Sequence, residues 1–141
     1  MKTVAQPTDR ETTTERAVDM NREQLQTYIT EIFHARAEHP FAAYPSYAVF
    51  RHDGNKKWFA VIMDIPGEKL GLTEVERLDI VNVKCDPIMI ASLRGKKGFY
   101  PAYHMNKDHW MTVALDSGVE EETIKDLLAI SYELTADRRK K

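Results

Sequence analysis

Apolar side chains recur at three- and four-residue steps in two stretches, one near each end of the chain. This spacing places them along one face of an amphipathic helix. The first stretch predicts a helix over residues 20–38, with Asp19 as its N-cap and Pro40 as its stop, because proline excludes the helical conformation from the residue before it. The second predicts a helix over residues 120–135, whose first turn carries glutamates that suit the positive end of the helix dipole.

Between these helices, apolar and polar residues alternate as they do in half-buried strands. Asp53-Gly54 separates two such runs and predicts a tight hairpin, since glycine accepts the positive φ that the turn needs. Further along, Asp86-Pro87 gives an N-cap followed by proline, which predicts a short helix up to Arg94. Its apolar residues are spread around almost the whole circumference of the helix, so we expect the helix to be well buried. The predicted strands cover residues 47–51, 58–63, 79–84 and 109–115, with a charged excursion at 67–77 and a loop at 95–108.

The predicted order is helix, hairpin, strand, short helix, strand and helix. This order favours the α+β class, with a mostly antiparallel sheet packed by the N- and C-terminal helices. No linker separates two cores, so we expect one domain over residues 19–136. Residues 1–18 carry threonines and charges but few apolar side chains, which predicts a disordered leader. Residues 137–141 form a charged tail.

Composition and charge exclude several classes of protein. Of the 141 residues, 43% are hydrophobic and 30% are charged, which is typical of a globular domain. The formal net charge of −2 gives no strong overall attraction to nucleic acid or acidic lipid. The single cysteine, Cys85, allows no internal disulfide, and the apolar runs are too short to cross a bilayer. With no apolar signal segment at the start, we expect a cytoplasmic protein without membrane contact.

The chain lacks the common catalytic signatures, such as Gly-x-Ser-x-Gly, a glycine-rich phosphate loop or His-Glu-x-x-His. We therefore expect no enzyme activity and no cofactor. Cys85 ends a predicted strand and is interpreted as a small buried side chain rather than a nucleophile. His104 and His109 are five residues apart, which fits no standard helical metal pair, so no metal site is expected. An enzyme that used both histidines for proton transfer would need a pocket that both imidazoles face.

One segment, residues 91–110, concentrates cations and aromatic rings. It holds four basic residues and one acid, so its charge is +3 within a chain of −2. Such cations can contact phosphates while the rings stack on bases; the alternative is a solvated loop whose rings close the edge of the core. The residues expected to contact nucleic acid are Arg94, Lys96, Lys97 and Lys107, with Arg51 and Lys57 from the hairpin, and Tyr100, Tyr103 and His104 as stacking side chains.

Six short runs occur in a fixed order after the leader: Ala-Val-Phe-Arg (48–51), Lys-Trp-Phe-Ala (57–60), Val-Lys-Cys-Asp-Pro (83–87), Ser-Leu-Arg (92–94), Pro-Ala-Tyr-His-Met-Asn-Lys-Asp-His-Trp (101–110) and Ile-Ser-Tyr-Glu-Leu (130–134). Together they resemble the MmcQ/YjbR family, in which glycine commonly stands at the position of Ala102. The resemblance implies a compact α+β domain similar to the CyaY-like fold of bacterial frataxin. It also implies DNA binding, a family label that rests on structural analogy with a double wing. It supplies no catalytic residues.

DNA and another protein are therefore the two expected partners. The first hypothesis is a non-enzymatic DNA-binding protein that contacts phosphates through the basic, aromatic loop. The alternative is a protein-interaction adaptor that uses an open sheet face. An exposed apolar face would favour the adaptor: Tyr47, Val49 and Arg51 share one side of the first strand, while Ala48 and Phe50 share the other.

Overall fold

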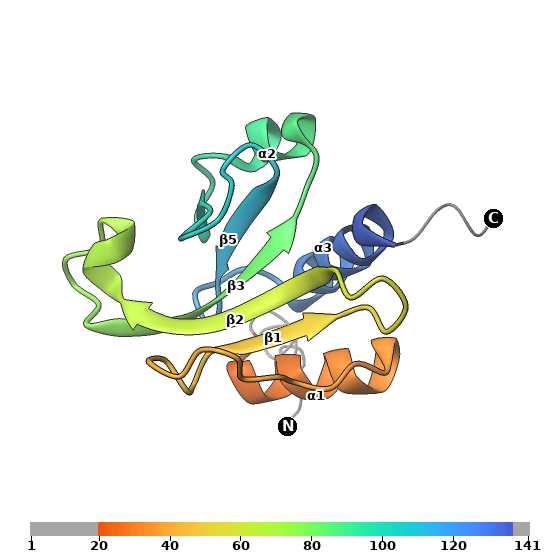
Figure 1. Cartoon of the computed structure of the whole chain (residues 1–141). Coiled ribbons are helices and arrows are strands. Elements are labelled where there is room, and N and C mark those ends of the chain that lie inside the picture. Colours follow the sequence, from red (N-terminus) through yellow and green to blue (C-terminus); the bar gives the residue numbers. More distant parts are fainter. Residues whose placement is uncertain (1–19, 137–141) are drawn as a thin grey trace, which may run out of the picture.

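The computed structural model describes residues 20–136, so the expected leader and charged tail lie outside the described residues. Within that range, three α-helices accompany a five-stranded antiparallel sheet with strand order β1-β2-β3-β5-β4 (Figure 1). This confirms the α+β class and the single domain; the likeness to the frataxin fold stays a prediction. The elements are α1 (Arg22–Phe33), β1 (Ala48–Arg51), β2 (Trp58–Pro66), the 3-10 helix η2 (Gly67–Leu70), β3 (Arg77–Lys84), α2 (Pro87–Leu93), β4 (Phe99–Pro101), β5 (Trp110–Ala114) and α3 (Glu121–Thr135).

The first helix is shorter than predicted at its C-terminal end. Asn21, not Asp19, caps its start, because the Asn21 side chain accepts a hydrogen bond from the backbone N–H of Gln24. The helix ends at Phe33, and His34 adopts a left-handed conformation with φ of 57°. The prediction of a helix to residue 38 is therefore wrong. Glu38, the last residue of the predicted helix, instead joins the edge of the sheet, because Glu38 and Val49 exchange two backbone hydrogen bonds of 2.9 and 2.8 Å.

The region around α2 corrects two further expectations. Ile88 is 83% exposed and Ile90 is buried, so this helix contacts the core with one side only, and the expectation that it is well buried is wrong. The physical reason is that α2 lies at the top of Figure 1 and α1 at the bottom, so α1 does not cover the outer side of α2. The predicted loop at 95–108 also contains β4, a three-residue strand that ends in Pro101. Proline is tolerated there because β4 is an edge strand.

The two faces of the sheet are covered differently. Helices α1 and α3 pack on one face, where Leu25 and Leu128 belong to the same apolar cluster as Phe50 and Phe59. On the opposite face, loop segments supply the cover over Tyr47, which is 8% exposed. This second apolar cluster consists of Tyr47, Val49, Val61, Met63, Ile65 and Ile80, with Phe41, Trp58, Leu70, Leu78, Tyr103 and Met105 packed against it. The exposed apolar face that would favour an adaptor is therefore not found at Tyr47 and Val49.

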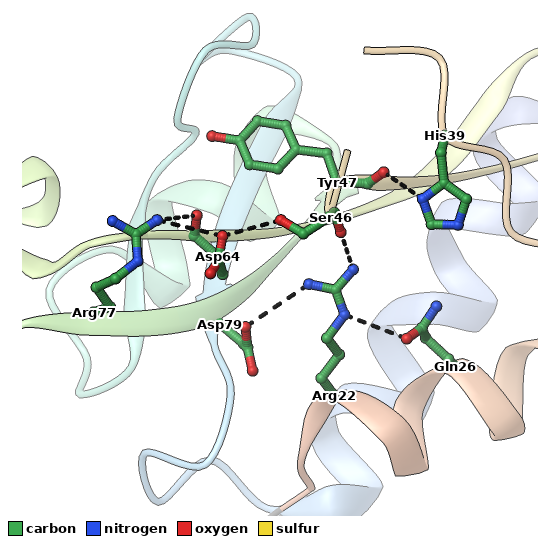
Figure 2. Close-up of polar contacts among 8 residues, drawn as sticks. All are labelled: Arg22, Gln26, His39, Ser46, Tyr47, Asp64, Arg77 and Asp79. Carbon is green, nitrogen blue, oxygen red and sulfur yellow. Dashed lines mark hydrogen bonds and ion pairs between the residues drawn. The ribbon is translucent and has the colours of Figure 1, made fainter. Parts of the chain in front are cut away.

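Arg22 fastens the segment between α1 and β1 (Figure 2). Its guanidinium donates to the backbone carbonyl of Ser46 and lies 3.8 Å from a carboxylate oxygen of Asp79. Asp79 and Asp64 are directly opposite each other in the β2–β3 pair, and Arg77 contacts Asp64 at 3.3 Å. Burial is the main cause that raises the pKa of Asp79, against the opposing effect of Arg22.

Candidate nucleic-acid interface

A buried polar network fixes the loop between β4 and β5 onto the sheet. Asn82 of β3 and Thr112 of β5 are register partners, and both are fully buried. The Thr112 hydroxyl donates to the Asn82 side-chain carbonyl and accepts from the backbone N–H of Tyr103 at 2.9 Å. The Asn82 amide in turn donates to the Tyr103 carbonyl at 3.0 Å. Both backbone groups of Tyr103 are thus satisfied by side chains of the sheet, which determines where the loop runs.

A cleft of about 460 Å³ lies between this loop and the 3-10 helix η2. It opens on the face of the sheet that α1 and α3 do not cover, since Tyr103 and Leu70 also belong to the loop-covered apolar cluster. Four of the predicted contact residues line it together: Tyr100, Tyr103, His104 and Lys107. The remaining lining residues are Lys69, Leu70, Pro101 and Ala102.

The chemistry of the cleft is cationic and aromatic. Lys69 and Lys107 are exposed, and neither forms an ion pair with any of residues 20–136. The rings of Tyr103 and His104 are in contact, with centroids 4.0 Å apart and planes tilted by 53°. His104 has a left-handed φ of 62°, a conformation that non-glycine residues adopt rarely and that often occurs at binding sites. No carboxylate lines the cleft, so the lining carries no negative charge that would repel an anion.

The other five predicted residues are not brought to the cleft. Arg51 ends β1, at the opposite edge of the sheet from β4. Four strand spacings separate the two edges, which is about 19 Å. Arg51 also binds the Glu38 carboxylate, with the closest nitrogen and oxygen 2.9 Å apart. The residues outside the cleft are Arg51 and Lys57, from the hairpin, and Arg94, Lys96 and Lys97, which follow α2.

The two histidines of the loop do not converge on one site. His104 lines the cleft, whereas His109 does not and accepts a hydrogen bond on its backbone carbonyl from the Cys85 N–H at 2.9 Å. Residues 20–136 contain no group of three His, Cys, Asp or Glu side chains placed to hold a metal ion. Cys85 is 1% exposed, and burial raises the pKa of its thiol to about 11. The interpretation of Cys85 as a small buried side chain is confirmed.

A family model named YjbR matches residues 18–134. The chain belongs to the YjbR family. The uncharacterized protein YyaQ of Bacillus subtilis (strain 168) is 37% identical over 116 residues, which is 82% of this chain and 98% of YyaQ. The uncharacterized protein YbdF of Escherichia coli O157:H7 is 30% identical over 66 residues, covering 46% of this chain and 54% of YbdF.

Solved structures of other proteins share the fold. A crystal structure of a Pseudomonas syringae protein superimposes with a TM-score of 0.81 at 44% identity, covering 83% of this chain and all of that one (100%). A crystal structure of a Deinococcus radiodurans protein with a DUF419 domain gives a TM-score of 0.64 at 25% identity, covering 84% of this chain and 80% of that one. Among residues 20–136, no helix combines the length and the apolar character needed to cross a membrane. A cytoplasmic location stays a prediction.

Sequence reasoning about this YjbR domain missed Lys69, Asn82 and Thr112. Lys69 lies in the charged excursion between two strands, 38 positions before Lys107, and no motif links the two. Asn82 and Thr112 occur as polar residues in alternating strands, where polar positions normally indicate the solvent side. In this domain the sheet face that carries Asn82 and Thr112 is buried under the β4–β5 loop, so polar residues at these positions point inward. Only the register of the sheet shows that the two residues are partners.

Proposed function

We propose that this protein binds DNA through the cleft between η2 and the β4–β5 loop. The observation that carries the proposal is that two lysines and several aromatic rings line the same cleft, and that no acidic residue is among its lining residues. Lys69 and Lys107 would contact phosphates as point charges, and the Tyr100 and Tyr103 rings with the His104 imidazole would stack on bases. The proposal includes no catalytic step and no cofactor.

The position of the cleft determines which cations the proposal includes. Lys69 reaches the cleft from η2 and Lys107 from the β4–β5 loop, so together they can contact consecutive phosphates of one DNA strand. Arg51 and Lys57 lie at the hairpin and fall outside the proposed interface. Arg94, Lys96 and Lys97 extend the positive charge beyond the cleft along the chain that leads into β4, where they can steer DNA toward it.

The test is a fluorescence anisotropy titration of labelled single-stranded and duplex DNA at low salt. Binding should weaken with added salt, because phosphate contacts release counterions. We expect Lys69→Ala and Lys107→Ala each to lower the slope of log affinity against log salt by about one unit. Both side chains are exposed, so each variant should keep the free energy of unfolding within about 0.5 kcal/mol of the parent.

Lys57→Ala is the matched comparison, since Lys57 is also an exposed lysine but lies at the hairpin. Its slope and affinity should remain those of the parent protein. Equal losses in all three variants would indicate a diffuse charge effect and contradict the cleft. No binding of either DNA form at low salt would overturn the proposal. Destabilisation by Lys107→Ala with an unchanged slope would make the loop a structural element instead.

A further inference from the structure

A second pocket, of about 480 Å³, lies on the other face of the molecule, where α1 ends beside the β1–β2 hairpin. Its walls come from four parts of the chain: the end of α1, the extended segment after it, the hairpin turn and α3. Phe33 and Tyr132, which line it, pack against the helix-covered core cluster. It is therefore separate from the proposed DNA cleft, which opens on the loop-covered face.

The pocket has more positive than negative charge. Arg36, Arg51 and Lys56 line it against two acids. The Glu38 carboxylate contacts the Arg51 guanidinium twice, at 2.9 and 3.1 Å, so the charges of this pair offset each other. Arg36 and Lys56 form no ion pair with any of residues 20–136, which leaves two free cations facing the single acid Asp53.

One side of the pocket is built from rings. The Phe33 and Tyr132 rings have centroids 4.8 Å apart, and the His52 imidazole lies against Tyr132 at 4.1 Å. His52 is only 9% exposed. Its Nε2 donates to the Tyr132 carbonyl at 3.0 Å or the Thr135 hydroxyl oxygen at 2.9 Å, which orients the imidazole. The other nitrogen, Nδ1, has no hydrogen-bond partner among the described residues.

Two backbone positions in the lining are in a conformation that side chains disfavour. His34 and Lys56 both have left-handed φ, 57° and 66°. Such conformations are found more often than elsewhere at ligand-binding sites. Here they present one imidazole and one ammonium to the same pocket from two different elements.

We propose that this pocket binds a small organic anion in which a carboxylate or phosphate group is attached to a planar ring. The anionic group meets Arg36 and Lys56, with Arg51 held beside them by Glu38. The ring packs against Phe33 and Tyr132. The proposal is independent of DNA binding, because the two sites share no residue.

Phenyl phosphate is the probe, and amide chemical shifts of the ¹⁵N-labelled full chain are the readout. We expect saturable shifts at the amides of residues 34–36 and 52–56, with a dissociation constant in the millimolar range. Inorganic phosphate, which lacks the ring, should bind roughly three- to tenfold more weakly. Arg36→Gln should weaken phenyl phosphate about five- to tenfold, because it removes a charge-assisted hydrogen bond.

Arg94→Gln is the matched control, since Arg94 is an exposed arginine outside the pocket. Its dissociation constant for phenyl phosphate should match that of the parent protein. The ¹⁵N spectrum of each variant shows whether it is folded, and Lys56→Gln provides a second test of the charge. Absence of saturable shifts at these amides, equal weakening by the Arg36 and Arg94 variants, or unchanged affinity in both pocket variants would overturn the proposal.

Discussion

Replacing Thr112 by valine removes one buried hydroxyl and preserves the shape of the side chain. The hydroxyl has two roles: it donates to the Asn82 carbonyl oxygen and accepts from the Tyr103 N–H at 2.9 Å. Thr112→Val therefore leaves one acceptor and one donor without partners in a region where Asn82 and Thr112 are both fully buried. Each unsatisfied group costs about 1–3 kcal/mol, so we expect a total loss of about 3 kcal/mol.

Thermal unfolding followed by circular dichroism measures this loss. For a chain of this size, about 3 kcal/mol corresponds to a fall in melting temperature of roughly 10 °C. Amide hydrogen exchange gives a local readout of the same effect, because the Tyr103 N–H loses its acceptor and should exchange faster. Since Tyr103 lines the cleft, the variant should also bind DNA more weakly at temperatures where it remains folded.

Thr30→Val is the control, because Thr30 is exposed on α1 and valine has a similar helix propensity. Its unfolding free energy should change by less than about 0.5 kcal/mol. If Thr112→Val melted with the parent protein, or if its Tyr103 amide kept its protection, the Asn82–Thr112 network would not be what positions the loop.

Three further predictions concern stability. Ser131→Ala should cost about 2 kcal/mol in a urea melt, because the Ser131 hydroxyl donates to one strand carbonyl at 2.6 Å and accepts from one strand N–H at 2.8 Å; an unchanged midpoint would contradict this. Burial raises the pKa of Asp79, so its ionised form opposes folding once the pH exceeds the ordinary carboxyl range. Asp79→Asn should then raise the melting temperature at pH 7 and leave it unchanged in acid, whereas a decrease at pH 7 would show that the ion pair with Arg22 outweighs burial. Gly98→Ala should destabilise the protein by about 2–3 kcal/mol more than Gly95→Ala in the same melt. Both glycines have positive φ, but a Cβ on Gly98 would lie 2.3 Å from Val119, while Gly95 faces open space, so equal effects would refute the steric argument.

Local patterns were sufficient to predict most elements of this fold. Alternation in β2 and β3 and helical spacing in α3 are signals within single segments, and the structure places these elements within a few residues of their predicted bounds. The end of α1 was predicted less well. Residues after Phe33 keep a helix-compatible composition, but Glu38 finds its backbone partners on β1, and a contact of that kind is not encoded in the local pattern.

The candidate site shows the same limit. The loop between Tyr100 and Lys107 is contiguous, so its lysine and its rings could be identified as a group. Lys69 reaches the same cleft from another element, and the sheet order moves Arg51 to the opposite edge. Both facts depend on how segments distant in the sequence are arranged in the sheet, and a local sequence pattern does not encode that arrangement.

The most direct test of the DNA proposal is an amide chemical-shift titration of the ¹⁵N-labelled protein with a short single-stranded oligonucleotide. The cleft predicts saturable shifts at residues 69–70 and 100–107, which shrink as salt is added. Residues 34–36 and 52–56, on the other face, should remain unperturbed. Shifts confined to the hairpin, or none at the cleft under low salt, would contradict the assignment of DNA binding to this surface.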